Sequence, residues 1–155
     1  MPRVETIRFA LAVPAGVLVM GAAVGALEAA GHALFPAGPG MTEAIDLMRR
    51  GDPSARDALA RAIAALSVPA KASIVFAWTA GAAFGTLASC RVAGSRQVPL
   101  AISIGVITMI FVAANLVAIP HPASVAIAGI ALPPLAAIGV GRLLRGVVRS
   151  PVARG

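Results

Sequence analysis

Four stretches of about twenty predominantly apolar residues recur along this chain of 155 residues. They cover residues 9–31, 68–90, 98–119 and 123–143. A helix of about 20 such residues crosses the hydrocarbon core of a bilayer, which is about 30 Å thick. Because lipid cannot satisfy free backbone groups, stretches of this length must be helical. We therefore predict an all-α membrane protein with four transmembrane helices in a single domain, residues 1–155.

The composition agrees with this prediction. Hydrophobic residues make up 59% of the chain and charged residues only 12%, whereas soluble domains carry about 25% charged residues. So few charges cannot cover the surface of a soluble monomer, and so apolar a chain is not intrinsically disordered. A lone cysteine, Cys90, excludes an intrachain disulfide.

The basic residues predict the orientation. Eight arginines lie at the two termini and in the second loop: Arg3, Arg8, Arg91, Arg96, Arg142, Arg145, Arg149 and Arg154. Basic residues in short flanking segments mark the cytoplasmic side. We therefore predict an up-down-up-down bundle with both termini in the cytoplasm. The richness in arginine, alanine and glycine indicates a GC-rich genome, so the expected location is a bacterial inner membrane.

Three of these arginines, Arg142, Arg145 and Arg149, form a basic stripe at the end of the fourth stretch and just beyond it. Anionic lipid headgroups at the inner leaflet account for it, so the predicted partners are membrane lipids and not nucleic acid. Arg3 and Arg8 also resemble the charged region of a cleaved signal peptide. The apolar run after them exceeds the usual 7–15 residues, which favours a retained helix.

The first loop, residues 37–66, is predicted to hold two short amphipathic helices on the outer membrane surface. Gly51 separates two series of apolar residues at helical spacing. The first series is Met41, Ile45 and Met48, and the second is Leu59, Ile63 and Leu66.

Two pairs of glycines, Gly21 with Gly25 and Gly81 with Gly85, stand four residues apart in the first two stretches. Small residues at that spacing let helix backbones approach closely. The contact can be within one chain or between two copies in a homo-oligomer. We favour the first because such pairs are common in an alanine-rich chain.

Unusual polar residues gather in the outer half of the predicted bundle. From a rise of about 1.5 Å per residue, Glu28 and Asn115 lie about 12 and 10 Å from the bilayer centre, and Lys71 about 15 Å. His32 and His121 lie near the outer interface. We predict that Glu28, His32, Asn115 and His121 converge beneath the first loop, and that Lys71 neutralises Glu28. Trp78, near the bilayer centre, is expected to face the interior, where its N–H can find an acceptor.

This cluster has several interpretations. In the leading interpretation, which is non-enzymatic, the cluster ties helices together or recognises a small partner. Glu28, His32 and His121 form an alternative ligand set for a divalent metal, and the two histidines for a haem. No cofactor is predicted in the leading interpretation.

Two further alternatives use the same residues. In a proton- or ion-coupled path, Glu28 would titrate and His32 would relay the proton outward. In an enzyme that acts on a lipid or quinone, His32 would be the base. The sequence offers no nucleophile–base pair, which makes the enzyme the weaker alternative.

Short motifs give a resemblance. The segment from Glu28 to His32 (Glu-Ala-Ala-Gly-His) with Pro36, then Asn115-Leu116 and Ile119-Pro120-His121-Pro122, resembles a set of small uncharacterised bacterial four-helix membrane proteins. The resemblance extends over most of the chain. It implies an inner-membrane location and four spans, and it implies no activity.

Overall fold

The structure, a computed structural model, describes residues 2–95 and 97–149, and the side chains of residues 6–95 and 97–145. Within these ranges the secondary structure is entirely helical: α1 (Pro2–Leu34), α2 (Pro39–Arg49), α3 (Ala55–Ala65), α4 (Val68–Ala93), α5 (Gln97–Ala118) and α6 (Ala123–Arg149). Four of them, α1, α4, α5 and α6, are long and apolar enough to cross a membrane. The prediction of an all-helical chain with four helices that could span a membrane is therefore confirmed.

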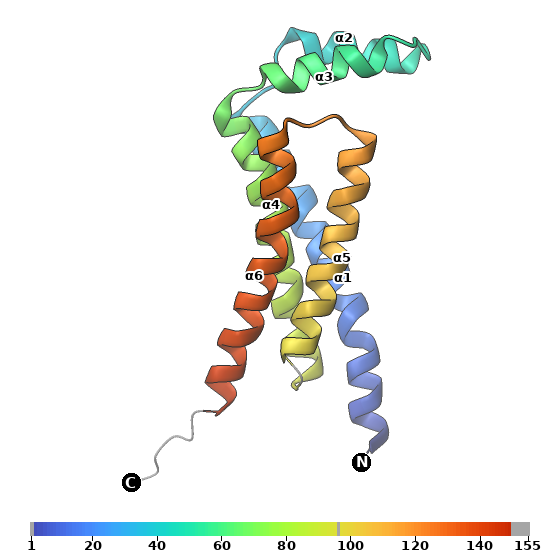
Figure 1. Ribbon diagram of the computed structural model, residues 1–155. Coiled ribbons are helices and arrows are strands. Elements are labelled where there is room, and N and C mark those ends of the chain that lie inside the picture. Colours follow the sequence, from blue (N-terminus) through green and yellow to red (C-terminus); the bar gives the residue numbers. More distant parts are fainter. Residues whose placement is uncertain (1, 96, 150–155) are drawn as a thin grey trace.

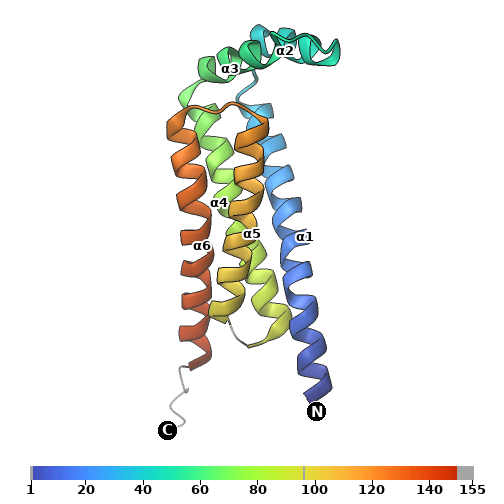
Figure 2. The ribbon, with the colours of Figure 1, turned by 45° about the vertical axis from the view of Figure 1, so that its right-hand side comes forward.

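The four long helices lie side by side, and both ends of the described chain are at the same end of the bundle (Figure 1). The turned view shows α2 and α3 lying across the opposite end (Figure 2). We call α2 and α3 the cap, and the two ends of the bundle the cap end and the terminal end. Helix α4 packs against each of the other long helices, whereas α1 contacts α5 only lightly. This uneven packing positions the site described below.

Local chemistry sets the ends of α4. The Ser67 hydroxyl accepts a hydrogen bond from the backbone N–H of Ala70 at 3.3 Å, and Pro69 occupies the first turn. At the other end Gly94 adopts φ +71°, and its N–H donates to the carbonyl of Cys90. The helix therefore runs three residues past the apolar stretch 68–90.

The seam between α1 and α4 brings two helix backbones close together. A Cβ added to Gly85 would lie 2.8 Å from the carbonyl oxygen of Gly16 and 2.8 Å from the Cβ of Met20. One added to Gly81 would lie 3.2 Å from the Met20 carbonyl. The Ser89 hydroxyl extends the seam by donating to the Ala12 carbonyl at 2.9 Å. Gly81 and Gly85 thus lie where α1 and α4 approach closely within one chain.

The other pair, Gly21 and Gly25, was predicted to lie at a close helix contact, and within this chain that prediction is wrong. A Cβ at Gly21 or Gly25 would meet no atom within 4 Å. The stripe of α1 that faces α4 instead runs through Ala12, Gly16 and Met20, which are buried at a spacing of four residues. A stripe through residues 21 and 25 lies on a different side of the helix.

The cap is held together by a small apolar cluster of Ala44, Leu59 and Ile63, against which Met41 and Leu66 pack. Ile119, at the end of α5, joins the same cluster and so connects the cap to the bundle. Ile45 and Met48, which were predicted to share the face of Met41, are exposed.

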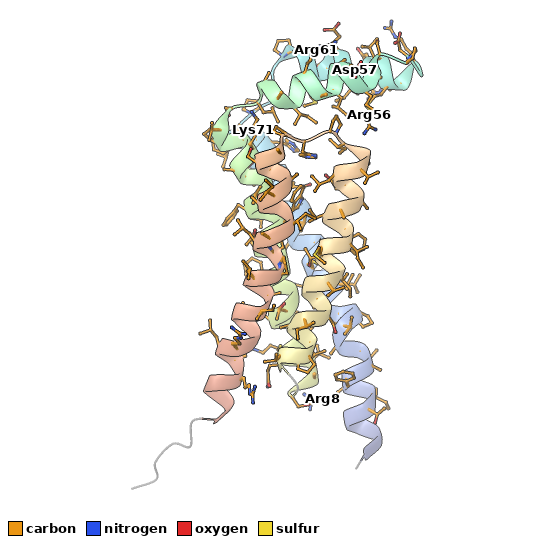
Figure 3. The ribbon with its side chains drawn as sticks, viewed as in Figure 1. Arg8, Arg56, Asp57, Arg61 and Lys71 are labelled. Carbon is orange, nitrogen blue, oxygen red and sulfur yellow. The ribbon has the colours of Figure 1, made fainter. Side chains whose placement is uncertain are left out.

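Polar contacts order the cap further. Between its helices, the Ser54 hydroxyl and N–H donate to Asp52 Oδ1 at 2.6 and 2.8 Å. These two bonds stabilise the carboxylate and lower the pKa of Asp52. Arg56, one of the charged cap residues in Figure 3, donates from Nη2 to the Val117 carbonyl at 3.3 Å.

Arginines lie at the terminal end as well. Arg8 donates from Nε to the Val92 carbonyl at 3.0 Å and ties α1 to the end of α4 (Figure 3). Arg142 and Arg145 are exposed near the end of α6. The predicted orientation also depends on Arg3, Arg96, Arg149 and Arg154, whose side chains lie outside the described residues.

The α1–α4 seam yields a matched test of two glycines. We expect Gly85→Ala to lower the free energy of unfolding by about 1–3 kcal/mol, because the new methyl group overpacks the seam. Gly25→Ala should leave it unchanged or raise it by up to about 1 kcal/mol, because alanine is the better helix former and no neighbour obstructs it. Unfolding in one detergent measures both. Equal losses in the two variants would contradict the assignment of the seam.

Candidate functional site

Four of the five predicted polar residues meet beneath the cap. Glu28 and His32 from α1, Asn115 from α5 and His121 from the turn before α6 line one cavity of about 200 Å³. We call it the cap cavity. Its other lining residues are Met41, Leu59, Ile63, Leu66, Ile74, Trp78 and Ile119. The apolar face of the cap thus covers the polar side chains of the bundle.

The principal polar contact joins Trp78 to Glu28. The indole Nε1–H donates to Glu28 Oε1 at 2.9 Å, and Trp78 is only 5% exposed. The sequence predicts an indole that faces the interior beside an acceptor, but it does not identify that acceptor. The sequence does contain the information that identifies it. A tryptophan inside a span needs an acceptor, and Glu28 is the carboxylate of the neighbouring span.

The predicted pairing of Lys71 with Glu28 is wrong. Lys71 donates from Nζ to the Ala64 carbonyl at 2.6 Å, at the end of α3. This contact has a physical cause, because the last carbonyls of a helix lack partners within the helix and attract a cation. Among the described side chains the ion pair is instead Arg49 with Asp46 on α2, at 3.8 Å.

The Pro-His-Pro turn fixes the imidazole of His121. Its Nδ1 lies 2.8 Å from the Ile119 carbonyl oxygen. Because a carbonyl only accepts, Nδ1 must carry the hydrogen, and Nε2 of the neutral ring is then an acceptor. The ring meets the Trp78 indole edge to face, with centroids 5.8 Å apart and planes at 62°. His32 also lines the cap cavity but is largely exposed.

Asn115 brings an unsatisfied acceptor to the site. Its Oδ1 is buried and has no hydrogen-bond partner within the described part of the chain. Buried polar atoms without partners are rare in native proteins, and each calls for an explanation. The amide lies beside Glu28, since both residues line the same two cavities.

The second of these cavities is a groove of about 320 Å³ between α1 and α5, which we call the α1–α5 groove. It shares Glu28, Trp78 and Asn115 with the cap cavity, so the two meet at these residues. The rest of its lining is mainly apolar: Val17, Met20, Gly21, Val24, Thr108, Phe111 and Val112. The groove forms where α1 and α5 touch only lightly.

The terminal half of the bundle uses its hydroxyl groups for helix contacts. Each of four hydroxyls donates to a backbone carbonyl: Thr79 to Val75, Ser89 to Ala12, Ser103 to Pro99 and Thr108 to Ile104. The hydroxyl of Thr86 is buried without a partner among the described residues. Four of the five groups that a relay would need are therefore engaged with the backbone.

The alternative metal site is not assembled in this structure. Among the side chains of residues 6–95 and 97–145, no three of histidine, cysteine, aspartate or glutamate are grouped so that they could hold a metal ion. Glu28, His32 and His121 share a cavity without forming such a group.

Comparisons with protein families, curated proteins and solved structures found no match.

The contact between Trp78 and Glu28 can be tested by a double-mutant cycle. We expect a coupling energy of about 0.5–2 kcal/mol between Trp78→Phe and Glu28→Leu, the range for hydrogen bonds inside membranes. The control cycle pairs Lys71→Met with Glu28→Leu and should give a coupling close to zero. Unfolding in mixed micelles, followed by circular dichroism, measures all variants. A larger coupling for Lys71 would contradict the structure.

Proposed function

We propose that this chain is a multi-pass protein of a bacterial inner membrane, and that it binds the polar end of a small amphipathic molecule. In this proposal the bundle runs up-down-up-down, both termini are cytoplasmic and the cap lies on the outer face. Orientation and location rest on the arginine distribution and on the resemblance carried by the Glu28–His32 and Pro-His-Pro segments.

The position of Glu28 carries the proposal. The carboxylate stands where the cap cavity meets the α1–α5 groove, and no described cation pairs with it. Two acceptors line the cap cavity with it, namely Asn115 Oδ1, which is buried without a partner among the described residues, and His121 Nε2 in the neutral ring. A negative charge with these two acceptors beside it favours a ligand that brings donors and a positive charge, above all an ammonium group.

The route to the site supports an amphipathic ligand. The α1–α5 groove is lined mainly by apolar side chains such as Val24, Phe111 and Val112, and it lies between two predicted spans. An apolar tail would fit there, while the polar end reaches Glu28 and Asn115. The cap covers the cavity from the other side, which shields a charged contact from water and strengthens it.

Fixed geometry favours recognition over chemistry at this site. The Trp78 N–H orients Glu28, and the bond to Ile119 orients His121. Side chains held in this way present a fixed pattern of acceptors, which lowers the entropic cost of binding.

Proton or ion movement through the same cluster is the second candidate. The exposed His32, one helical turn beyond Glu28 toward the cap, favours it. We rank it second because the hydroxyls of Thr79, Ser89, Ser103 and Thr108 donate to backbone carbonyls.

Binding can be measured through the fluorescence of Trp78, the single tryptophan of the chain. In phosphatidylcholine nanodiscs, we expect dodecylammonium to change this fluorescence saturably, because its ammonium group would meet Glu28 beside the indole. Dodecanoate has a tail of similar length and the opposite charge, and should give no saturable change. Equal responses to the two amphiphiles would refute a site selective for cations.

The matched variants are Glu28→Gln and Glu43→Gln. The first keeps an oxygen that accepts from Trp78 but removes the charge, so affinity for dodecylammonium should fall about 10- to 100-fold, as expected for a hydrogen bond to a charged group. Glu43 is exposed on α2, and its substitution should leave the affinity unchanged. Parental affinity in Glu28→Gln would sink the proposal.

A further inference from the structure

A second groove runs between α4 and α6. Its volume is about 590 Å³, and it shares no lining residue with the cap cavity or the α1–α5 groove. Lys71 and Ser124 line its cap end, and Thr79 and Leu132 lie farther toward the terminal end. The site proposed around Glu28 does not use this groove.

The cap end of the groove carries an uncompensated positive charge. Lys71 is half-buried, and one bond joins its Nζ to the Ala64 carbonyl. An ammonium has three donors, so two remain for another acceptor. No carboxylate among the described side chains forms an ion pair with Lys71. Figure 3 shows this residue at the cap end of α4, one turn inside the start of the helix.

The length of the groove is close to the thickness of the hydrocarbon layer of one leaflet. Lys71 and Thr79 are eight residues apart on α4, which corresponds to about 12 Å along the helix. Ser124 and Leu132 are eight residues apart on α6, which gives the same length. Half of the hydrocarbon core is about 15 Å thick. Between the two ends, the apolar side chains of Val75 and Phe76 line the groove.

From this geometry we infer a binding site for one anionic phospholipid. The phosphate of the lipid contacts the Lys71 ammonium, and one acyl chain lies in the groove between α4 and α6. Charge complementarity selects an anionic over a zwitterionic headgroup, because the ammonium has no other anion beside it. The inference does not rest on the function proposed for Glu28.

Native mass spectrometry tests the site. The protein is reconstituted in an equal mixture of phosphatidylglycerol and phosphatidylcholine, then released into mild detergent. We expect one phosphatidylglycerol to remain bound per chain. Lys71→Gln should lower the preference for phosphatidylglycerol about fivefold, the factor for about 1 kcal/mol per basic residue near a membrane surface. Lys71→Arg should keep the preference, because the charge remains.

Two controls separate a built site from general attraction to a basic surface. Arg61→Gln removes an exposed cation of α3 that does not line the groove, so the preference should persist. Ala128→Phe fills the groove and keeps Lys71, so retention of both lipids should fall. Parental preference in Lys71→Gln, or an equal loss in Arg61→Gln, would overturn the inference. So would full retention in Ala128→Phe, which also decides the matter if Lys71→Gln does not fold.

Discussion

The hydrogen bond from Trp78 to Glu28 places a tryptophan at the centre of the bundle, and much of the cap-end packing depends on that position. The indole reaches across to α1, lies edge-on to His121 and packs with Val112 of α5. On α6, a Cβ at Gly129 would lie 2.5 Å from one indole carbon and 2.8 Å from another. The side chain thus touches all three other long helices, and it fixes how closely α6 can approach.

This contact compensates part of the cost of Glu28. An ionised side chain at the centre of a membrane helix costs about 2.5–3.5 kcal/mol on insertion scales. Hydrogen bonds inside membranes return about 0.6 kcal/mol on average and about 1.7 at most. That cost applies at the bilayer centre, whereas Glu28 is predicted to lie about 12 Å away, so it is an upper limit to what a charged Glu28 costs beside Trp78. Such a cost is expected at a binding residue, because a bound cation would stabilise the carboxylate.

The spans were predictable because hydrophobicity over about twenty residues leaves few alternatives in lipid. The gathering of Glu28, His32, Asn115 and His121 was also predictable, since helices of alternating direction place residues of equal depth at one end. The contacts between individual side chains of different helices were not predictable in this way. The predicted pairing of Lys71 with Glu28 assumes that each apolar stretch is centred in the bilayer. In the structure, Gly31 of α1 packs against Ser73 and Gly16 against Gly85. This register brings Glu28 opposite Trp78 and leaves Lys71 beyond Gly31.

The register also has a consequence for charge. Had Lys71 met Glu28, the two would have neutralised each other, and neither would attract a charged molecule. In the observed arrangement the carboxylate lines the cavities beside α1 and α5, and the ammonium lines the groove between α4 and α6. The small residues of the α1–α4 seam, Gly16, Gly81 and Gly85, hold the two charges apart by fixing the register. A single packing seam thereby leaves one acidic and one basic side chain unpaired, each beside a space large enough for a ligand of opposite charge.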